Sequence, residues 1–256
     1  MFINSSTSLR PHCVAIALLL TAHNAFSAPV KERRVLEEVI VSAQKVEQSS
    51  QDVPISLTAV SGEFMKEVGA VNLQDLAPYM PNVRFSSDTD PALTQVNIRG
   101  FGSNPLNAAF ESSVGFVQDE VFYNRPSYFS EAMFDIARIE VLRGPQSTLF
   151  GKNASAGVIS VTTQAPTRTL SGKFDALIAE NEEYALRGTV ASPISETVLG
   201  RLTAFTKSQK GHIKNVSDGR NLNGYDNWGV RGKILVQPSD ALDLTFIADY
   251  RDTQQD

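Results

Sequence analysis

The sequence predicts an α+β domain followed by a series of antiparallel β-strands. Between residues 52 and 166, short segments with the apolar spacing of helices alternate with β-branched runs, which is typical of a compact α+β domain. Beyond Thr169, repeated segments have an apolar residue at every second position, as expected for strands with one apolar face. This change of pattern divides the chain into two structural parts.

The composition excludes some partners and one kind of membrane segment. The 256 residues carry a formal net charge of −5, so the chain has no basic surface of the kind that binds nucleic acid. No run of about 18 apolar residues is present, which excludes a transmembrane helix. A membrane β-barrel stays possible, because barrel strands hide their lipid-facing residues in an alternating pattern.

Residues 1–27 have the features of a secretory signal peptide: Arg10, an apolar run over 14–20, and the small residues Ala25 and Ser27 before the cleavage point. We predict that the mature chain begins at Ala28. A buried N-terminal helix is the alternative interpretation of the same run.

The mature chain lacks the residues that most active sites need. The only cysteine, Cys13, lies in the signal peptide, and His212 is the one histidine that remains. Disulfides, thiolate metal sites and cysteine nucleophiles are therefore excluded. A Ser-His-Asp triad would depend on His212, which lies in a polar loop, and no G-x-S-x-G motif is present. We predict no catalytic residues, no metal site and no cofactor, and hence a protein that is not an enzyme.

Residues 28–51 are predicted to form a flexible leader. A short β-branched run within it, Val39 to Ala43, lies between charged and polar flanks. Such a run cannot bury itself, but it is suited to pairing with the sheet edge of another protein. The alternative interpretation is a core strand of the domain that follows.

The domain over 52–166 is predicted to contain short helices and strands. In chain order these are a strand over 55–60, a helix over 64–68, a short helix capped by Asn72, strands over 94–100 and 114–121, and a helix near 130–134. Its most informative segment, Ala137 to Thr163, reads ARIEVLRGPQSTLFGKNASAGVISVTT, with two β-branched runs around a glycine-spaced turn.

That segment carries the strongest family resemblance in the chain. R-I-E-V-L-R-G-P followed by S-T-L-F-G and A-G-V-I-S-V closely resembles the end of the plug domain of TonB-dependent outer-membrane receptors. The strand over 94–100 ends in an Arg-Gly pair similar to the I-R-G element of that family. The run Glu38, Val39, Ile40, Val41, Ser42, Ala43 is similar to the TonB box.

The resemblance implies a plug inside a β-barrel of about 22 strands in the bacterial outer membrane, in contact with its lipid. It implies that the TonB box over 38–43 binds the periplasmic C-terminal domain of TonB, which works with an inner-membrane energising complex. It also implies that Arg99 and Arg143 face glutamates of the barrel wall. Phe101 and Asn104, near the expected plug apex, are the candidate ligand contacts.

The implied function is energy-coupled import of a scarce nutrient, with an iron–siderophore complex as the first choice. Haem, cobalamin and oligosaccharides are alternatives within the same family. A secreted β-sandwich binding module would explain the signal peptide and the strands but not the segment 137–163. A periplasmic enzyme would need a polar catalytic constellation that the sequence does not supply.

The alternating segments over 167–256 are expected to be the first five strands of an incomplete transmembrane β-barrel. The breaks near 193–197 and 238–240 are short, whereas 208–226 is long and polar, and barrels have short periplasmic turns and longer external loops. Five strands cannot enclose a plug, so we expect a truncated, N-terminal fragment that does not transport by itself.

Overall fold

The computed structural model describes residues 40–42, 45–46, 48–86, 94–102, 111–123, 126–129, 133–179, 182–211, 213–222 and 224–255. The description concerns the unit over 39–256. The predicted signal peptide, Glu38, Val39, Ala43 and Asn104 lie outside the described residues.

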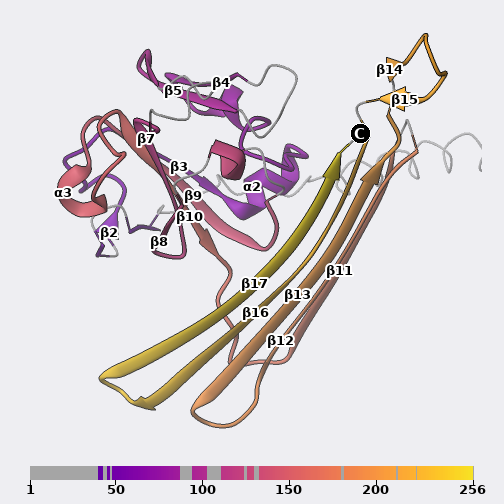
Figure 1. Cartoon of the computed structure of the whole chain (residues 1–256). Coiled ribbons are helices and arrows are strands. Elements are labelled where there is room, and N and C mark those ends of the chain that lie inside the picture. The colour runs from indigo at the N-terminus through magenta and orange to yellow at the C-terminus, as the bar shows by residue number, and fades with distance from the viewer. Residues whose placement is uncertain are drawn as a thin grey trace, which may run out of the picture. The chain divides into compact units, whose positions relative to one another are not determined.

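The domain after the leader is built on a five-stranded sheet in the order β3–β9–β10–β7–β8, here called the mixed sheet (Figure 1). Its strands are β3 (Leu57–Ser61), β7 (Val114–Gln118), β8 (Val121–Tyr123), β9 (Ile136–Arg143) and β10 (Gly157–Thr163). β10 is antiparallel to β9 and parallel to β7. The β-branched run of β10 is central and buried, with Val158, Ile159 and Val161 at 0% exposure.

Helix α2 (Gly62–Glu67) lies against β9, and the small residue at its start allows the close contact. The Ser61 hydroxyl caps the helix by accepting a 3.1 Å hydrogen bond from the amide of Phe64. Gly62 is required by a close approach, since a Cβ at this position would lie 1.9 Å from the carbonyl oxygen of Ile136. The inner face of α2 places Met65 in the main core cluster of the domain.

Two of the helices predicted from the sequence are not formed as predicted. After Asn72 the chain makes turns that end in the 3-10 helix η2 (Ala77–Tyr79), because Pro78 prevents a longer helix. Asn72 nevertheless caps the turn, since its Oδ1 accepts a 3.0 Å hydrogen bond from the amide of Asp75. The helix predicted near 130–134 is not formed at its two described residues, Met133 and Phe134.

Short elements complete this part of the chain. The leader strand β1 (Ile40–Val41) pairs with β2 (Gln48–Ser49). A separate small sheet joins β4 (Val83–Ser86), β5 (Gln95–Ile98) and β6 (Phe101–Gly102). The 3-10 helix η4 (Pro126–Phe129) precedes β9, and helix α3 (Ser147–Phe150) lies in the turn between β9 and β10.

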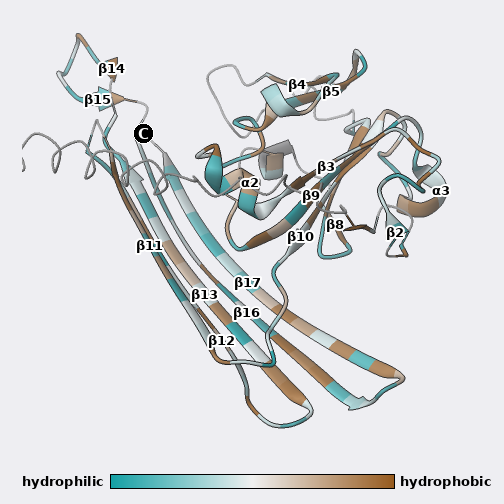
Figure 2. Ribbon diagram, turned by 180° about the vertical axis from the view of Figure 1, so that it is seen from behind, coloured by the Kyte–Doolittle hydropathy of each residue, from teal (hydrophilic) through white to brown (hydrophobic). Residues whose placement is uncertain are grey.

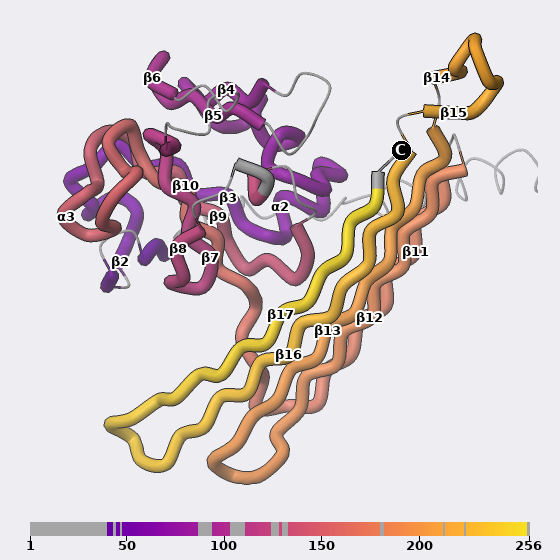
Figure 3. The backbone as a smooth tube through the Cα atoms, in the orientation of Figure 1, coloured from indigo at the N-terminus to yellow at the C-terminus, as the bar shows by residue number. Residues whose placement is uncertain are grey.

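The second part is an antiparallel meander, here called the long sheet, in the order β11–β12–β13–β16–β17 (Figures 1 and 3). Its strands are β11 (Ser171–Ala179), β12 (Glu183–Pro193), β13 (Val198–Gln209), β16 (Tyr225–Ser239) and β17 (Leu242–Gln255). The short hairpin β14 (Ile213–Lys214) and β15 (Asn221–Leu222) lies in the connection between β13 and β16. Five strands therefore form where five were expected, and the predicted fold class is confirmed.

The two faces of the long sheet differ as the alternation predicted, which Figure 2 shows as alternating colours along the strands. The register aligns Arg201 with Lys233, and these positions face the mixed sheet. The opposite face carries exposed apolar side chains, including Leu186, Leu202, Val230, Ile234 and Phe246. Among the described residues, no helix is long and apolar enough to cross a membrane.

Candidate functional site at the contact of the two sheets

Asp135 is held by the long sheet at the entry to β9. Its carboxylate accepts hydrogen bonds from both Nε (2.7 Å) and a terminal nitrogen of Arg201, and from the hydroxyl of Thr203 (2.9 Å). Burial alone raises the pKa of the Asp135 carboxyl, but the hydrogen bond and charge of Arg201 outweigh it, so the pKa lies below its ordinary value. The ion pair is nearly closed to solvent, with side-chain exposures of 6% for Asp135 and 13% for Arg201.

Asp119 forms a second contact in which a carboxylate pairs with a cation of the long sheet. It lies in the turn between β7 and β8 and accepts hydrogen bonds from the amide (2.9 Å) and hydroxyl (2.7 Å) of Thr163. The buried Lys233 ammonium donates to Asp119 at 3.2 Å and to the carbonyl of Thr163 at 3.1 Å. Carboxylates of the domain built on the mixed sheet thus pair with cations of the long sheet at two places.

Phe134, next to Asp135, adds aromatic and cation–π interactions with the long sheet. Its ring lies 4.3 Å from that of Phe205, and the guanidinium carbons of Arg231 and Arg251 lie 4.2 and 5.2 Å from its centroid. Arg231, at 2% exposure, also donates to the carbonyl of Phe134 (2.8 Å) and to Asp249 (2.5 Å). Phe205 is the aromatic residue on an otherwise polar face of β13, and its packing on Phe134 accounts for this position.

The leader is attached to the middle of β9. The amide of Ser42 donates a 2.7 Å hydrogen bond to Glu140, whose side chain is fully buried. Arg138 donates to Glu140 (3.0 Å) and to the hydroxyl of Ser42 (2.8 Å), which satisfies the carboxylate and completes a three-residue latch. Val41 is also fully buried, whereas Ile40 is 51% exposed.

Arg143 lies at the other end of β9 and is 8% exposed. Its guanidinium donates to the carbonyl of Pro81 (3.0 Å) and to the hydroxyls of Ser56 (3.5 Å) and Thr58 (2.5 Å), none of which carries a charge. Burial, and then the charge of Arg99, lower the pKa of Arg143. The Arg143 guanidinium thus lies near a like charge, and among the described residues no carboxylate is bonded to either arginine.

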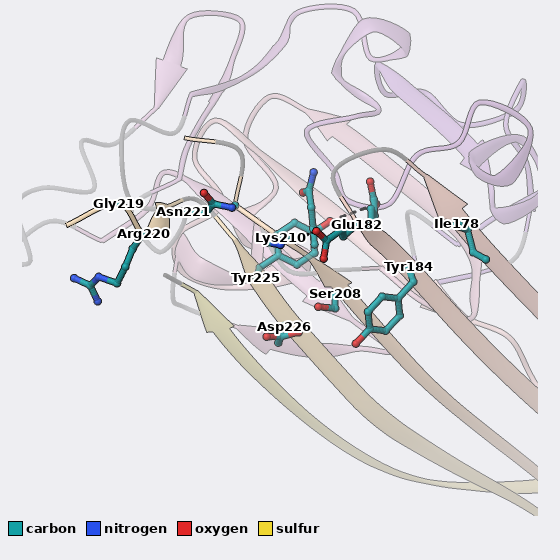
Figure 4. A pocket seen from close by; sticks show the side chains of 13 residues that line it. Ile178, Glu182, Tyr184, Ser208, Lys210, Gly219, Arg220, Asn221, Tyr225 and Asp226 are labelled. Atoms are coloured by element: carbon teal, nitrogen blue, oxygen red, sulfur yellow. Dashed lines mark hydrogen bonds and ion pairs between the residues drawn. The ribbon is translucent and has the colours of Figure 1, made fainter. Parts of the chain in front are cut away.

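A large open pocket lies at the opposite end of the long strands, where β12, β13 and β16 meet the β14–β15 hairpin (Figure 4). Its volume is about 820 Å³. Tyr184, Ser208 and Asp226 occupy neighbouring strands at one side of it. Lys210 is paired with Glu182 at 2.6 Å, so the pocket presents no concentrated charge.

No cofactor or metal site is formed by these residues. Within the described ranges, no group of three or more His, Cys, Asp or Glu side chains could hold a metal ion. What the arrangement offers is mechanical: two buried ion pairs and an aromatic cluster hold one domain against one sheet, and a short leader strand is hydrogen-bonded to the same domain.

Comparison with known proteins identifies this domain. Residues 49–158 match the family model of the TonB-dependent receptor plug domain. Residues 49–158 therefore form a TonB-dependent receptor plug domain. The family resemblance and the outer-membrane localisation predicted from the sequence are thereby confirmed.

Relatives of this receptor chain are similar over most of its length. It is 24% identical to the pesticin receptor of Yersinia pestis over 234 residues, which cover 89% of this chain and 32% of the relative. It is 29% identical to the vitamin B12 transporter BtuB of Vibrio vulnificus over 221 residues, 84% of this chain and 34% of the relative. The chain thus spans about a third of the length of these relatives.

A solved structure shares the fold of the receptor chain. The ferric yersiniabactin uptake receptor FyuA from Yersinia pestis superposes with a TM-score of 0.71 at 24% identity, over 78% of this chain and 32% of that protein. The mixed sheet and the long sheet are thus the plug and the first wall strands of the family fold.

The predicted site residues of the receptor fall into separate places. Within the predicted TonB box, Ile40 and Val41 form β1, and Ser42 belongs to the latch with Glu140. Phe101 is 71% exposed on β6. Arg99, with a φ of 55°, lines a pocket of about 530 Å³ beside that small sheet. The roles proposed for these residues stay predictions.

Asp119 and Asp135 are the functional residues that the sequence analysis missed. Both have positive φ, 47° and 57°, at the ends of strand patterns, and an Asp tolerates this conformation. The signal that could have found them was the polar face of the long strands. Arg201 and Lys233 on that face required buried counter-charges, and the nearest domain in the sequence was the place to look for them.

Proposed function

We propose that this chain forms the plug and the first part of the wall of an outer-membrane importer for a ferric siderophore. One observation supports the ligand class: a solved structure with the same fold is that of a ferric yersiniabactin uptake receptor. Vitamin B12 is the second candidate, because BtuB has the higher sequence identity to this chain.

The observation that carries the proposal is the course of β9. This one strand begins beside Asp135, which is bonded to the long sheet, bears Glu140 at the leader latch, and ends at the buried Arg143. A force applied to the leader at Ser42 therefore reaches a central strand of the plug, which is where the contacts to the wall are made.

Energy coupling follows from the exposed side of the leader. β1 is paired with β2 alone among the described strands, so its other edge can accept a strand from a partner. We propose that the periplasmic domain of TonB adds there, and that pulling on β1 breaks the Ser42–Glu140 bond before the plug moves. Arg99 and Arg143 would meanwhile be held by carboxylates of the wall.

The test is uptake of defined ligands by cells in which this gene is the only receptor of its class. Cells are supplied with radiolabelled ferric yersiniabactin, ferric pyoverdine or cyanocobalamin, with and without a functional TonB. We expect TonB-dependent uptake of a ferric siderophore, and expression that rises on iron starvation. TonB-dependent uptake of cyanocobalamin alone would transfer the proposal to the second ligand, and uptake independent of TonB would overturn the coupling.

A further inference from the structure

A crevice of about 310 Å³ lies between the plug and the inner face of β11, β12 and β13. Four cationic side chains line it, one from α2 and three from the long sheet, and we call it the basic crevice: Lys66, Lys173, Arg187 and Lys207. Apolar side chains form the rest of its lining, among them Val71, Met133, Phe134, Leu177 and Phe205. The lining thus combines cationic side chains with apolar and aromatic ones.

The carboxylates nearby do not neutralise all four cations. Lys207 is 3.0 Å from Glu183, and Lys173 is 3.6 Å from Asp175. Within the described part of the chain, Lys66 and Arg187 have no ion pair. The Nε atom of Arg187 is buried and makes no hydrogen bond with the described residues. A buried donor of this kind is costly unless something accepts from it.

Lys66 shows the same imbalance. Partial burial lowers the pKa of the Lys66 ammonium group, although the residue is exposed overall; the side chain and charge of Lys173 lower it further, and Asp175 opposes this only in part. Arg187 adds a further like charge. Lys66 lies on α2, whereas Lys173 and Arg187 lie on the long sheet. An anion between these elements would interact favourably with cations of both.

We propose that the basic crevice binds an aromatic anion, a carboxylate or phenolate on a ring, which the transported ligand presents as it passes between plug and wall. This rests on the proposed function. The volume is at the lower end of the range of about 300–1,000 Å³ for small-molecule sites, so it suits one ring-bearing group and not a whole chelate. Phe205, which is only partly buried, supplies a surface for the ring, and Arg187 supplies a planar donor for its oxygens.

The test uses two probes of equal shape and different charge. Benzoate and benzamide are titrated by calorimetry into the detergent-solubilised protein expressed from its own gene. We expect benzoate to bind at least tenfold more tightly than benzamide. Equal affinities, or no benzoate binding, would overturn the proposal. Absence of benzoate binding would mean that a carboxylate of the wall already occupies the crevice.

Variants place the binding at the crevice. Lys66→Gln and Arg187→Gln should each weaken benzoate binding tenfold or more, while Lys66→Arg, which keeps the charge, should retain it. Lys210→Gln is the matched control, because Lys210 is an exposed cation already paired with Glu182 at the far end of the strands. Loss of binding in Lys210→Gln, or unchanged binding in both crevice variants, contradicts the proposal. Lys66 is exposed on α2, so its substitution leaves the fold intact.

The two proposals fail separately. A protein that imports a ferric siderophore but binds benzoate and benzamide equally keeps the proposed function and loses the anion site. A protein that binds benzoate through Lys66 and Arg187 but takes up only cyanocobalamin keeps an anion site with a different source for its ligand, and loses the siderophore proposal.

Discussion

The amide of Ser42 in the leader donates a 2.7 Å hydrogen bond to Glu140, a fully buried carboxylate 98 residues further along the chain. Arg138 bridges the two residues by donating to both. The leader is therefore not a free tail at this point, although its sequence predicted one. The bond links the segment proposed to bind TonB with the central strand of the plug.

Glu140→Ala should destabilise the plug and release the leader. The substitution removes a buried carboxylate from Arg138, and breaking a buried pair of this kind costs about 3–5 kcal/mol. Urea unfolding measures the loss, and amide exchange at Ser42 should become faster. Glu140→Gln is the control, since its amide oxygen can still accept from Ser42, and a loss equal to that of Glu140→Ala would contradict the latch.

Ile40→Pro should abolish uptake and leave ligand binding at the cell surface intact. Proline removes a backbone donor and fixes φ, so strand addition at β1 would fail. Ile40 is half exposed and lies outside the plug core, which keeps the effect away from folding. Ile40→Val preserves the β-branched strand and should transport normally. Normal uptake by the proline variant would refute strand addition at this site.

Stability should depend on Asp135 at low pH. Because the pKa of Asp135 in the folded protein lies below its unfolded value of about 3.9, its contribution is complete above that pH. It is lost as the pH falls further, through the folded pKa. Asp135→Asn should remove this part of the acid dependence and lower stability at neutral pH. The free energy of unfolding is measured for both proteins between about pH 6 and 2. If it fell with pH equally in the variant and the wild type, the result would contradict this role of Asp135.

The local patterns predicted the strands well and the contacts between parts poorly. Alternation placed Arg201 and Lys233 on one face, because side-chain direction in a strand follows from sequence position. Nothing local linked either cation to Asp135 or Asp119, since those pairs join residues 66 and 114 positions apart. Such partners are set by how sheets pack, which periodicity does not contain.

The leader is another segment whose long-range contacts could not be predicted from the local sequence. Its polar flanks predicted mobility, yet Val41 is buried and Ser42 is bonded to Glu140. The carboxylate that holds it belongs to the R-I-E-V-L-R-G-P string, which was recognised for its family likeness and not for its charge. A buried glutamate in a strand was itself a sign that a donor had to come from elsewhere.

Arg143→Ala should loosen the plug against the wall. The structure bonds Arg143 only to uncharged oxygens, with Arg99 as a neighbouring like charge, so the pair requires carboxylates that the described residues do not supply. We expect faster amide exchange across 137–163 and greater antibiotic leakage into cells. Arg168→Ala, a change outside the plug sheet, serves as the control. Unchanged exchange would assign Arg143 to local bonding of the plug alone.

Phe134→Ala should cost about as much stability as breaking a buried ion pair at the interface. The ring is buried at 1% exposure, packs on Phe205 at 4.3 Å, and lies under two guanidinium groups. Truncating a buried Phe costs about 3–5 kcal/mol, and Arg231 would also lose its cation–π partner while keeping its bond to Asp249.

The matched control for this variant is Phe101→Ala. Its ring is 71% exposed, so the free energy of unfolding should change by no more than about 0.5 kcal/mol. Since Phe101 is a candidate ligand contact, the same variant should weaken ligand binding while Phe134→Ala weakens the hold of the plug. Urea unfolding followed at Trp228, which lies on the long sheet, measures the change in stability. Surface binding of labelled ligand measures the change in ligand affinity. If Phe134→Ala proved as harmless to stability as Phe101→Ala, the aromatic cluster would not join the plug to the wall.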